Sequence, residues 1–214
     1  MKTTRFFLAA LIAAALSTSA FAQSKVLQAW DFSKIVKTKE GIVVPSPASK
    51  LNGLVFASGA SVGTDAEAPG GKVLVLDGTQ ISAGSPFLAL QAVDALVIKM
   101  SFKPAAKGAE NQTLLRLSGY ELRYSQSRNM LDFIVWHADQ TFTIVAVRVN
   151  AAIWNHVTAT NEAGKITLAI GGVVRTKDFP AGEVVDSKSG GIRVGFLNER
   201  PFTGSISALS LETP

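Results

Sequence analysis

Short runs in which apolar and polar residues alternate recur along the chain after residue 22, and this period of two restricts the fold more than any other feature. Segment 96–103 is the clearest example, and its alternating apolar residues are Leu96, Ile98, Met100 and Phe102. The same parity appears in segments 165–170 and 192–196. Because successive side chains of a strand point to opposite faces, each run predicts a strand with one buried face. No stretch after residue 22 shows the sustained spacing of three and four that is typical of helices.

About a dozen such segments are predicted between residues 26 and 211, separated by turn residues such as Asp77-Gly78 and Ser189-Gly190-Gly191. A single open sheet would leave the apolar faces of these strands in water, so we expect two packed sheets. The irregular stretch 34–71 is expected to form loops and short edge strands of the same domain. The predicted fold is an all-β, two-sheet antiparallel β-sandwich of the jelly-roll type.

The first 22 residues form a separate segment. Lys2 and Arg5 precede an apolar run from Phe6 to Leu16, and the small-residue motif Ala20-Phe21-Ala22 follows. This pattern is typical of a secretory signal peptide, and the run is shorter than the roughly 20 residues that span a bilayer. We therefore expect a signal peptide over 1–22, cleaved after Ala22, and a mature domain over 23–214. The mature protein is predicted to be periplasmic or extracellular, without a membrane anchor.

Composition excludes several classes of function. The 214 residues include no cysteine, which excludes thiol catalysis, cysteine–zinc centres and disulfide-stapled scaffolds. Lys2 and Arg5 account for two of the 21 basic residues, so the mature chain carries 19 basic against 16 acidic side chains, a net charge of +3. That charge, without a basic stripe, is not the electrostatic footprint of a nucleic-acid-binding protein.

Four segments carry a family resemblance. They are QAWDF at 28–32, KVLVLDGTQIS at 72–82, WNHVTATNEAGKITLAIGGVV at 154–174 and PFTGSISALSLE at 201–212. In this order they resemble the laminin-G-like branch of the concanavalin A-like lectin and glucanase superfamily. The resemblance implies a concanavalin A-like jelly roll. It leaves function open, because that superfamily includes glycan-binding modules, adhesion and structural domains, and enzymes.

The resemblance also bears on cofactors. Many relatives place an aspartate directly after the phenylalanine of the first strand, where it helps to bind a structural Ca²⁺. Here Ser33 follows Phe32, and Asp31 precedes it, which by alternation points to the opposite face. Two isolated histidines, His137 and His156, make no metal site. We expect no cofactor and no metal, with a structural Ca²⁺ as the alternative.

The catalytic motifs of the superfamily are incomplete in this chain. Retaining glucanases carry two carboxylates on one strand as Glu-x-Asp-x-x-Glu, and no Glu-x-Asp occurs here. Alginate lyases carry Arg-x-Glu-Leu-Arg, of which Glu121-Leu122-Arg123 is present but Gly119 replaces the first arginine. The glutamine expected two residues before a histidine is also replaced, by Val135 and Trp154. No catalytic residue is therefore assigned.

A nucleophile motif is also present by spacing. Gly59-Ala60-Ser61-Val62-Gly63 matches G-x-S-x-G, which requires a strand before the serine and a helix after it. The segment that follows, 64–71, has the composition of a loop, so we interpret the match as chance.

The remaining signal is the set of residues expected to face away from the core. If Leu115, Leu122 and Phe133 face inward, the outward side chains include Lys99, Arg116, Arg123, Asp132, Trp136 and Arg193. Tryptophan can stack on a sugar ring, and arginine forms bidentate contacts with carboxylate or sulfate. The candidate ligand-binding residues are Arg116, Arg123, Trp136 and Arg193. The alternative is cross-strand ion pairing of the arginines with Glu121 and Asp132, with a loop over Trp136.

Three interpretations of function remain open on the sequence. The first, which we predict, is a secreted non-catalytic laminin-G-like module that binds an extracellular or envelope glycan or a protein partner. The second is a structural or adhesion component without a site for a small ligand. The third is a polysaccharide lyase or glycoside hydrolase of the same superfamily.

Overall fold

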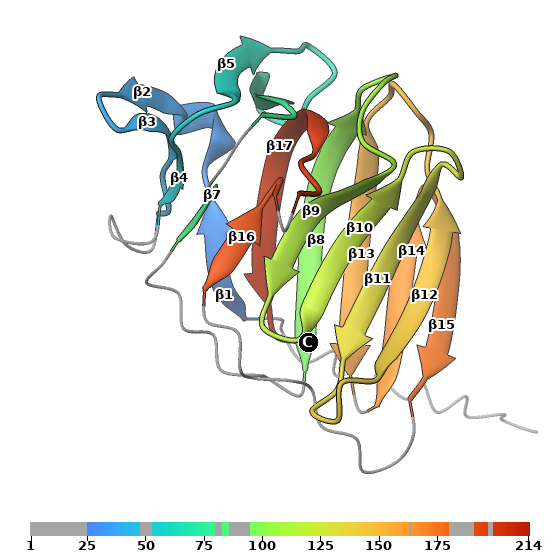
Figure 1. Ribbon diagram of the computed structural model, residues 1–214. Coiled ribbons are helices and arrows are strands. Elements are labelled where there is room, and N and C mark those ends of the chain that lie inside the picture. Colours follow the sequence, from blue (N-terminus) through green and yellow to red (C-terminus); the bar gives the residue numbers. More distant parts are fainter. Residues whose placement is uncertain are drawn as a thin grey trace, which may run out of the picture.

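The computed structural model describes residues 25–47, 53–79, 83–85, 95–162, 164–179, 191–196 and 199–214. They form seventeen strands and one short 3₁₀ helix, η1 (Phe32–Lys34), and the strands form two antiparallel sheets packed face to face (Figure 1). The predicted all-β sandwich is confirmed. The expected signal peptide, 1–22, lies outside the described residues. Among those residues, no helix has the length and apolarity needed to cross a membrane.

Eight strands make up the first sheet, called sheet A here. Its order is β15-β14-β13-β8-β17-β6-β5, and β1 also pairs with β17. The bounds are β1 Val26–Trp30, β5 Ala60–Thr64, β6 Lys72–Asp77, β8 Leu96–Pro104, β13 Asn155–Glu162, β14 Lys165–Ile170, β15 Val173–Asp178 and β17 Thr203–Glu212. The long strands β8 and β17 lie side by side in the middle of the sheet.

Nine strands make up the second sheet, sheet B, in the order β12-β11-β10-β9-β16-β7-β4-β3-β2. The bounds are β2 Val36–Thr38, β3 Gly41–Val44, β4 Leu54–Phe56, β7 Ala83–Ser85, β9 Asn111–Leu117, β10 Tyr120–Ser125, β11 Met130–Trp136, β12 Phe142–Arg148 and β16 Ile192–Val194. The short strands β2 to β5 all fall in the stretch 34–71, as expected. The longer strands β9 to β12 form the part of sheet B that covers β8, β13, β14 and β15 in Figure 1.

The core lies between the two sheets and consists of the side chains that the alternation pattern assigned to it. Leu96, Ile98 and Phe102 of β8 are fully buried, and so are Leu122 and Phe133 of sheet B. Fully burying a side chain of this size contributes roughly 1.5–3 kcal/mol relative to leaving it exposed. The packed inner faces therefore supply most of the stability, and the outer faces are available for other roles.

One contact joins the two sheets, and one close approach joins the two central strands of sheet A. The amide nitrogen Nδ2 of Asn161 in sheet A donates to the hydroxyl of Tyr120 in sheet B at 2.8 Å, across the core. Gly204 in β17 has φ +147° and lies so close to the carbonyl of Lys103 in β8 that a Cβ would clash with it. This close approach requires glycine at the fourth position of the PFTGS motif.

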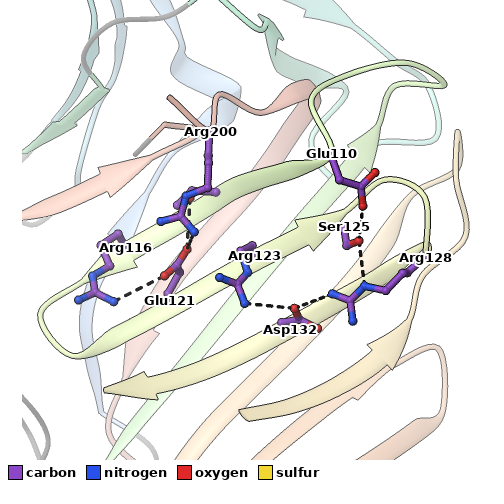
Figure 2. A network of polar contacts seen from close by, with 9 residues as sticks. Glu110, Arg116, Glu121, Arg123, Ser125, Arg128, Asp132 and Arg200 are labelled. Atoms are coloured by element: carbon purple, nitrogen blue, oxygen red, sulfur yellow. Dashed lines mark hydrogen bonds and ion pairs between the residues drawn. The ribbon is translucent and has the colours of Figure 1, made fainter. Parts of the chain in front are cut away.

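One expectation about solvent exposure is wrong. The parity argument placed Asp132 on a solvated face, but the Asp132 side chain is only 1% exposed. Glu121 and Ile134, which also lie on the outer side of β10 and β11, are buried as well. The physical reason for the carboxylates is that arginine side chains lie against both of them (Figure 2).

Candidate functional site

The four candidate residues of the sequence all lie on the outer face of sheet B. Arg193 of β16 is opposite Arg116 of β9, which is in turn opposite Glu121 of β10. Arg123 of β10 is opposite Asp132 of β11 in the neighbouring row. Trp136 is four residues beyond Asp132 on the same strand and therefore on the same side. We call this surface the arginine face; its residues are Glu110, Thr113, Arg116, Glu121, Arg123, Ser125, Arg128, Asp132, Trp136, Arg193 and Arg200.

Glu121 is the first of two buried carboxylates on the arginine face (Figure 2). Arg200 Nη1 lies 3.2 Å from its Oε1 and Arg116 Nη1 lies 3.7 Å from its Oε2. Thr113 donates a hydrogen bond to Oε1 at 3.3 Å. The Glu121 side chain is 1% exposed, so two guanidinium groups compensate a charge that has almost no contact with water.

Asp132 is the second buried carboxylate, and its Oδ2 atom serves two arginines. Arg128 Nη2 lies 3.0 Å from it and Arg123 Nη2 lies 3.6 Å from it. Arg128 also donates from Nε to Ser125 Oγ, which donates in turn to Glu110 Oε1 at 2.9 Å. Figure 2 shows this chain running from β11 across the β10–β11 turn to the start of β9. The cross-strand ion pairs expected from the sequence, Arg116–Glu121 and Arg123–Asp132, are therefore both present.

Glu110 lies at the edge of the arginine face and is held ionised by its donors. Hydrogen bonds from the Ser127 hydroxyl, and then from the Ser125 hydroxyl, lower its pKa below the ordinary value. The carboxylate is thus an acceptor that orders the turn carrying Arg128.

Trp136 is half-buried beside these ion pairs. Its ring centroid lies 5.1 Å from that of Phe142, with the two planes tilted by 54°. The guanidinium carbon of Arg116 lies 5.5 Å from the indole centroid, within the range of a cation–π contact. Arg116 thereby connects the aromatic ring to the Glu121 ion pair.

Three polar atoms of the arginine face are buried and lack a hydrogen-bond partner in the described part of the chain. They are Arg123 Nε, Asp132 Oδ1 and Trp136 Nε1. Most buried polar groups in folded proteins are hydrogen-bonded, and leaving one unsatisfied costs roughly 1–3 kcal/mol. These two donors and one acceptor therefore lack a partner within the face, and neighbouring atoms cover each of them from solvent.

The sequence did not single out Arg200 and Arg128, which complete the two carboxylate clusters. Arg200 precedes β17 and is held over β9 because Thr113 N donates to its carbonyl oxygen at 3.0 Å. This contact links positions 87 residues apart in the chain, and no local pattern indicates it. Arg128 lies in the β10–β11 turn, and its spacing of four residues before Asp132 was the available signal.

A second candidate lies on the outer face of sheet A, where a hollow of about 420 Å³ is lined by Lys99, Ser101, His156 and Thr158, among others. Ser101 Oγ and His156 Nδ1 lie 2.8 Å apart, and Lys99 Nζ lies 2.7 Å from Glu212 Oε2. These groups satisfy one another. The other histidine, His137, is buried, and its Nε2 lies 2.9 Å from Thr143 Oγ1.

The positions considered for a metal or a nucleophile have other roles. Asp31 caps η1 by accepting from Ser33 and forms an ion pair with Lys34 at 2.9 Å. The hydrogen bond from the Ser33 hydroxyl is the main cause of its lowered pKa. Across the described ranges, no group of three histidine, aspartate or glutamate side chains is placed to hold a metal ion. Ser61 lies exposed in strand β5, so the G-x-S-x-G segment forms no strand-to-helix turn.

No protein-family model and no curated protein matches this chain. Solved structures do. The binding domain of Paraclostridial Mosquitocidal Protein 1 aligns with a TM-score of 0.64 at 12% identity, over 88% of this chain and 49% of that one. Domain 4 of AbnA, a GH43 extracellular arabinanase from Geobacillus stearothermophilus, was solved with arabinotriose and aligns with a TM-score of 0.63 at 14% identity, over 90% and 94%.

A third similar structure is the botulinum neurotoxin serotype D ligand binding domain in complex with N-acetylneuraminic acid. It aligns with a TM-score of 0.55 at 13% identity, over 88% of this chain and 47% of that one. This chain thus spans about half the length of the toxin domains but nearly all of the arabinanase domain. At these identities the likeness shows the fold. The chain is a β-sandwich similar in fold to carbohydrate-binding and receptor-binding domains, and the laminin-G-like branch is not singled out.

Proposed function

We propose that this protein is a secreted, non-catalytic β-sandwich module that binds an extracellular or cell-envelope glycan through the arginine face. The observation that carries the proposal is the set of side chains gathered on one face: the half-buried Trp136, Arg116 with its guanidinium carbon 5.5 Å from the indole centroid, and Arg123 and Arg193 on strands of the same sheet. The signal-peptide pattern of residues 1–22 supports export, and the four sequence segments support a laminin-G-like relationship.

The chemistry of a sugar matches that set. Each hydroxyl can accept a hydrogen bond, so one ring can accept from the arginine guanidinium groups while it lies against the Trp136 indole. Aromatic side chains also present an apolar surface and a polar edge, a combination suited to a sugar ring.

The solved neighbours give independent support. One was solved with arabinotriose and another with N-acetylneuraminic acid, so sandwiches of similar fold hold saccharides. We take the saccharide class of ligand from those proteins. The position of the site, on the arginine face, is inferred from the contacts of this chain.

The environment of the two carboxylates supports a non-catalytic role. A general acid or base must reach the proton it transfers in a substrate complex. Glu121 and Asp132 are each 1% exposed, and two guanidinium groups flank each of them. Carboxylates held in this way are suited to positioning the arginine side chains. We therefore expect no release of reducing ends or unsaturated products from alginate, pectate, laminarin, agarose or xylan.

The test is affinity electrophoresis of the mature protein in gels that contain alginate, pectate or laminarin. We expect retardation by at least one polymer. Trp136→Ala and Arg123→Ala should weaken binding about tenfold to hundredfold, since an aromatic contact or a charge-assisted hydrogen bond contributes roughly 1–3 kcal/mol. His156→Ala, on the outer face of sheet A, is the matched control and should bind as the wild type does.

Thermal unfolding of every variant separates loss of binding from loss of fold. Weaker retardation of Trp136→Ala or Arg123→Ala supports the proposal when the variant is still folded at the temperature of the gel and migrates as the wild type does in a gel without polymer. Equal mobility of all variants in every gel contradicts it, and so does a loss of retardation that only His156→Ala shows.

A further inference from the structure

Two arginines of the arginine face stand directly opposite each other. Arg193 of β16 and Arg116 of β9 are cross-strand partners in an antiparallel pair. Directly opposed side chains of a sheet lie close together, and like charges in this position are destabilising. The sandwich therefore keeps two positive charges next to each other at a position where a neutral side chain would be more stable.

The carboxylates of the arginine face offset only part of this charge. Asp132 serves Arg123 and Arg128, and Glu121 lies between Arg116 and Arg200 (Figure 2). Arg193 is exposed, and within the residues that the structure describes it forms neither an ion pair nor a hydrogen bond through its side chain. Positive charge is thus in excess at the β9–β16 end of the face.

The excess charge adjoins the aromatic ring. Arg116, the partner of Arg193, holds its guanidinium carbon 5.5 Å from the centroid of the Trp136 indole. A ligand ring lying against Trp136 would place its substituents near Arg116 and, across the strand pair, near Arg193. Guanidinium groups bind carboxylate and sulfate with paired hydrogen bonds that are stronger than those between neutral groups.

We propose that the glycan bound by this face is acidic, and that its carboxylate or sulfate group is held between Arg193 and Arg116 while a sugar ring contacts Trp136. This inference rests on the proposed function and specifies its substrate class. In this arrangement Arg193 is the arginine available to pair with the ligand, since the other arginines already pair with the protein's carboxylates. A neutral glycan leaves the Arg116–Arg193 repulsion in place and therefore binds more weakly.

The experiment uses two matched pairs of polymers in affinity gels: polygalacturonate with its methyl-esterified form, and dextran sulfate with dextran. The first pair tests carboxylate and the second tests sulfate, each on an otherwise similar backbone. The wild type should bind at least one charged member about tenfold or more tightly than its neutral counterpart. Arg193→Gln should remove most of that preference while it leaves the melting temperature unchanged or higher.

Arg175→Gln is the control, because Arg175 is exposed on β15 of sheet A and the substitution changes the net charge by the same amount. It should leave the preference intact. Equal reduction by Arg193→Gln and Arg175→Gln would show general electrostatic attraction and overturn the inference. Equal binding of charged and neutral polymers would also overturn it and leave the proposed function standing. Absence of retardation by all four polymers and by the neutral laminarin would overturn both.

Discussion

The two outer faces of the sandwich have the same origin in alternating strands but differ in chemistry. Around its hollow, the outer face of sheet A presents short side chains such as Ser101 and Thr158, and Lys99 forms an ion pair with a single partner there, Glu212. One buried hydroxyl, Ser207 Oγ at the bulge of β17, has no hydrogen-bond partner among the described residues. Sheet B presents arginines around two carboxylates with almost no solvent contact. The difference shows that strand periodicity determines which residues face outward but not what that face does.

The energetics of buried charge make the contrast informative. Ion pairs removed from water are weak contributors to stability, because desolvation offsets much of their attraction. A sheet that needed only a solvated outer surface would be served by the short polar side chains of sheet A. We therefore propose that the buried carboxylates and opposed arginines of sheet B serve the recognition of a ligand.

The largest expected effect comes from breaking one charge cluster on each face. Asp132→Asn removes the anion between Arg123 and Arg128 and should lower the free energy of unfolding by roughly 1.5–3 kcal/mol, since hydrogen bonds to a charged, buried group are lost. Glu212→Gln removes the ion-pair partner of Lys99. Because the Lys99 side chain is half exposed, this change should lower the free energy of unfolding by about 1 kcal/mol or less. Urea denaturation of both variants at neutral pH measures the difference. Equal destabilisation would show that the two outer faces do not differ in the burial of their charges.

A smaller effect concerns Trp154, which contacts sheet A, and Trp136 of sheet B: their indole N–H resonances should respond differently as pH falls. Asp65 accepts from Lys103 Nζ at 3.0 Å and from Trp154 Nε1 at 3.1 Å, and so ties the β5–β6 loop to sheet A. The hydrogen bond from Lys103 is the main cause of the lowered pKa of Asp65. Because the folded-state pKa is below the usual 3.8, this contribution is complete above that pH and is lost as pH falls through the lowered pKa.

The measurement is the indole N–H resonance of each tryptophan between pH 6 and pH 2.5. Trp154 should shift in a transition centred below pH 3.8, and Asp65→Ala should abolish that transition. Trp136, whose indole nitrogen has no partner among the described residues, should not follow it. A Trp154 resonance that titrates identically in Asp65→Ala would contradict the assigned contact.

Much of this arrangement could be predicted from the sequence. Parity alone put Leu115, Leu122 and Phe133 in the core and the four candidate side chains on the opposite side, because a strand allows only two directions. It also indicated the cross-strand pairing of Arg116 with Glu121, since both lie in the same short stretch of chain.

The burial of individual side chains and the contacts between distant parts of the chain could not be predicted in this way. Parity gives the face of Asp132 but not its burial, which depends on how two long arginine side chains lie over it. Arg200 joins Glu121 through a segment that reaches β9 by a backbone hydrogen bond to Thr113, a contact that no local pattern contains. A strand of three residues such as β7 is too short to show a period.

The three tryptophans can show directly whether the proposed glycan site lies on the arginine face. Trp136 belongs to that face, Trp30 lines the hollow of sheet A, and Trp154 is bound to Asp65. The measurement is a titration of the ¹⁵N-labelled mature protein with trigalacturonate at neutral pH, following the three indole N–H resonances. If the glycan binds to the arginine face, we expect a saturable shift of the Trp136 resonance alone. Shifts of Trp30 or Trp154 with Trp136 unchanged, or no shift of any resonance at millimolar trigalacturonate, would contradict it.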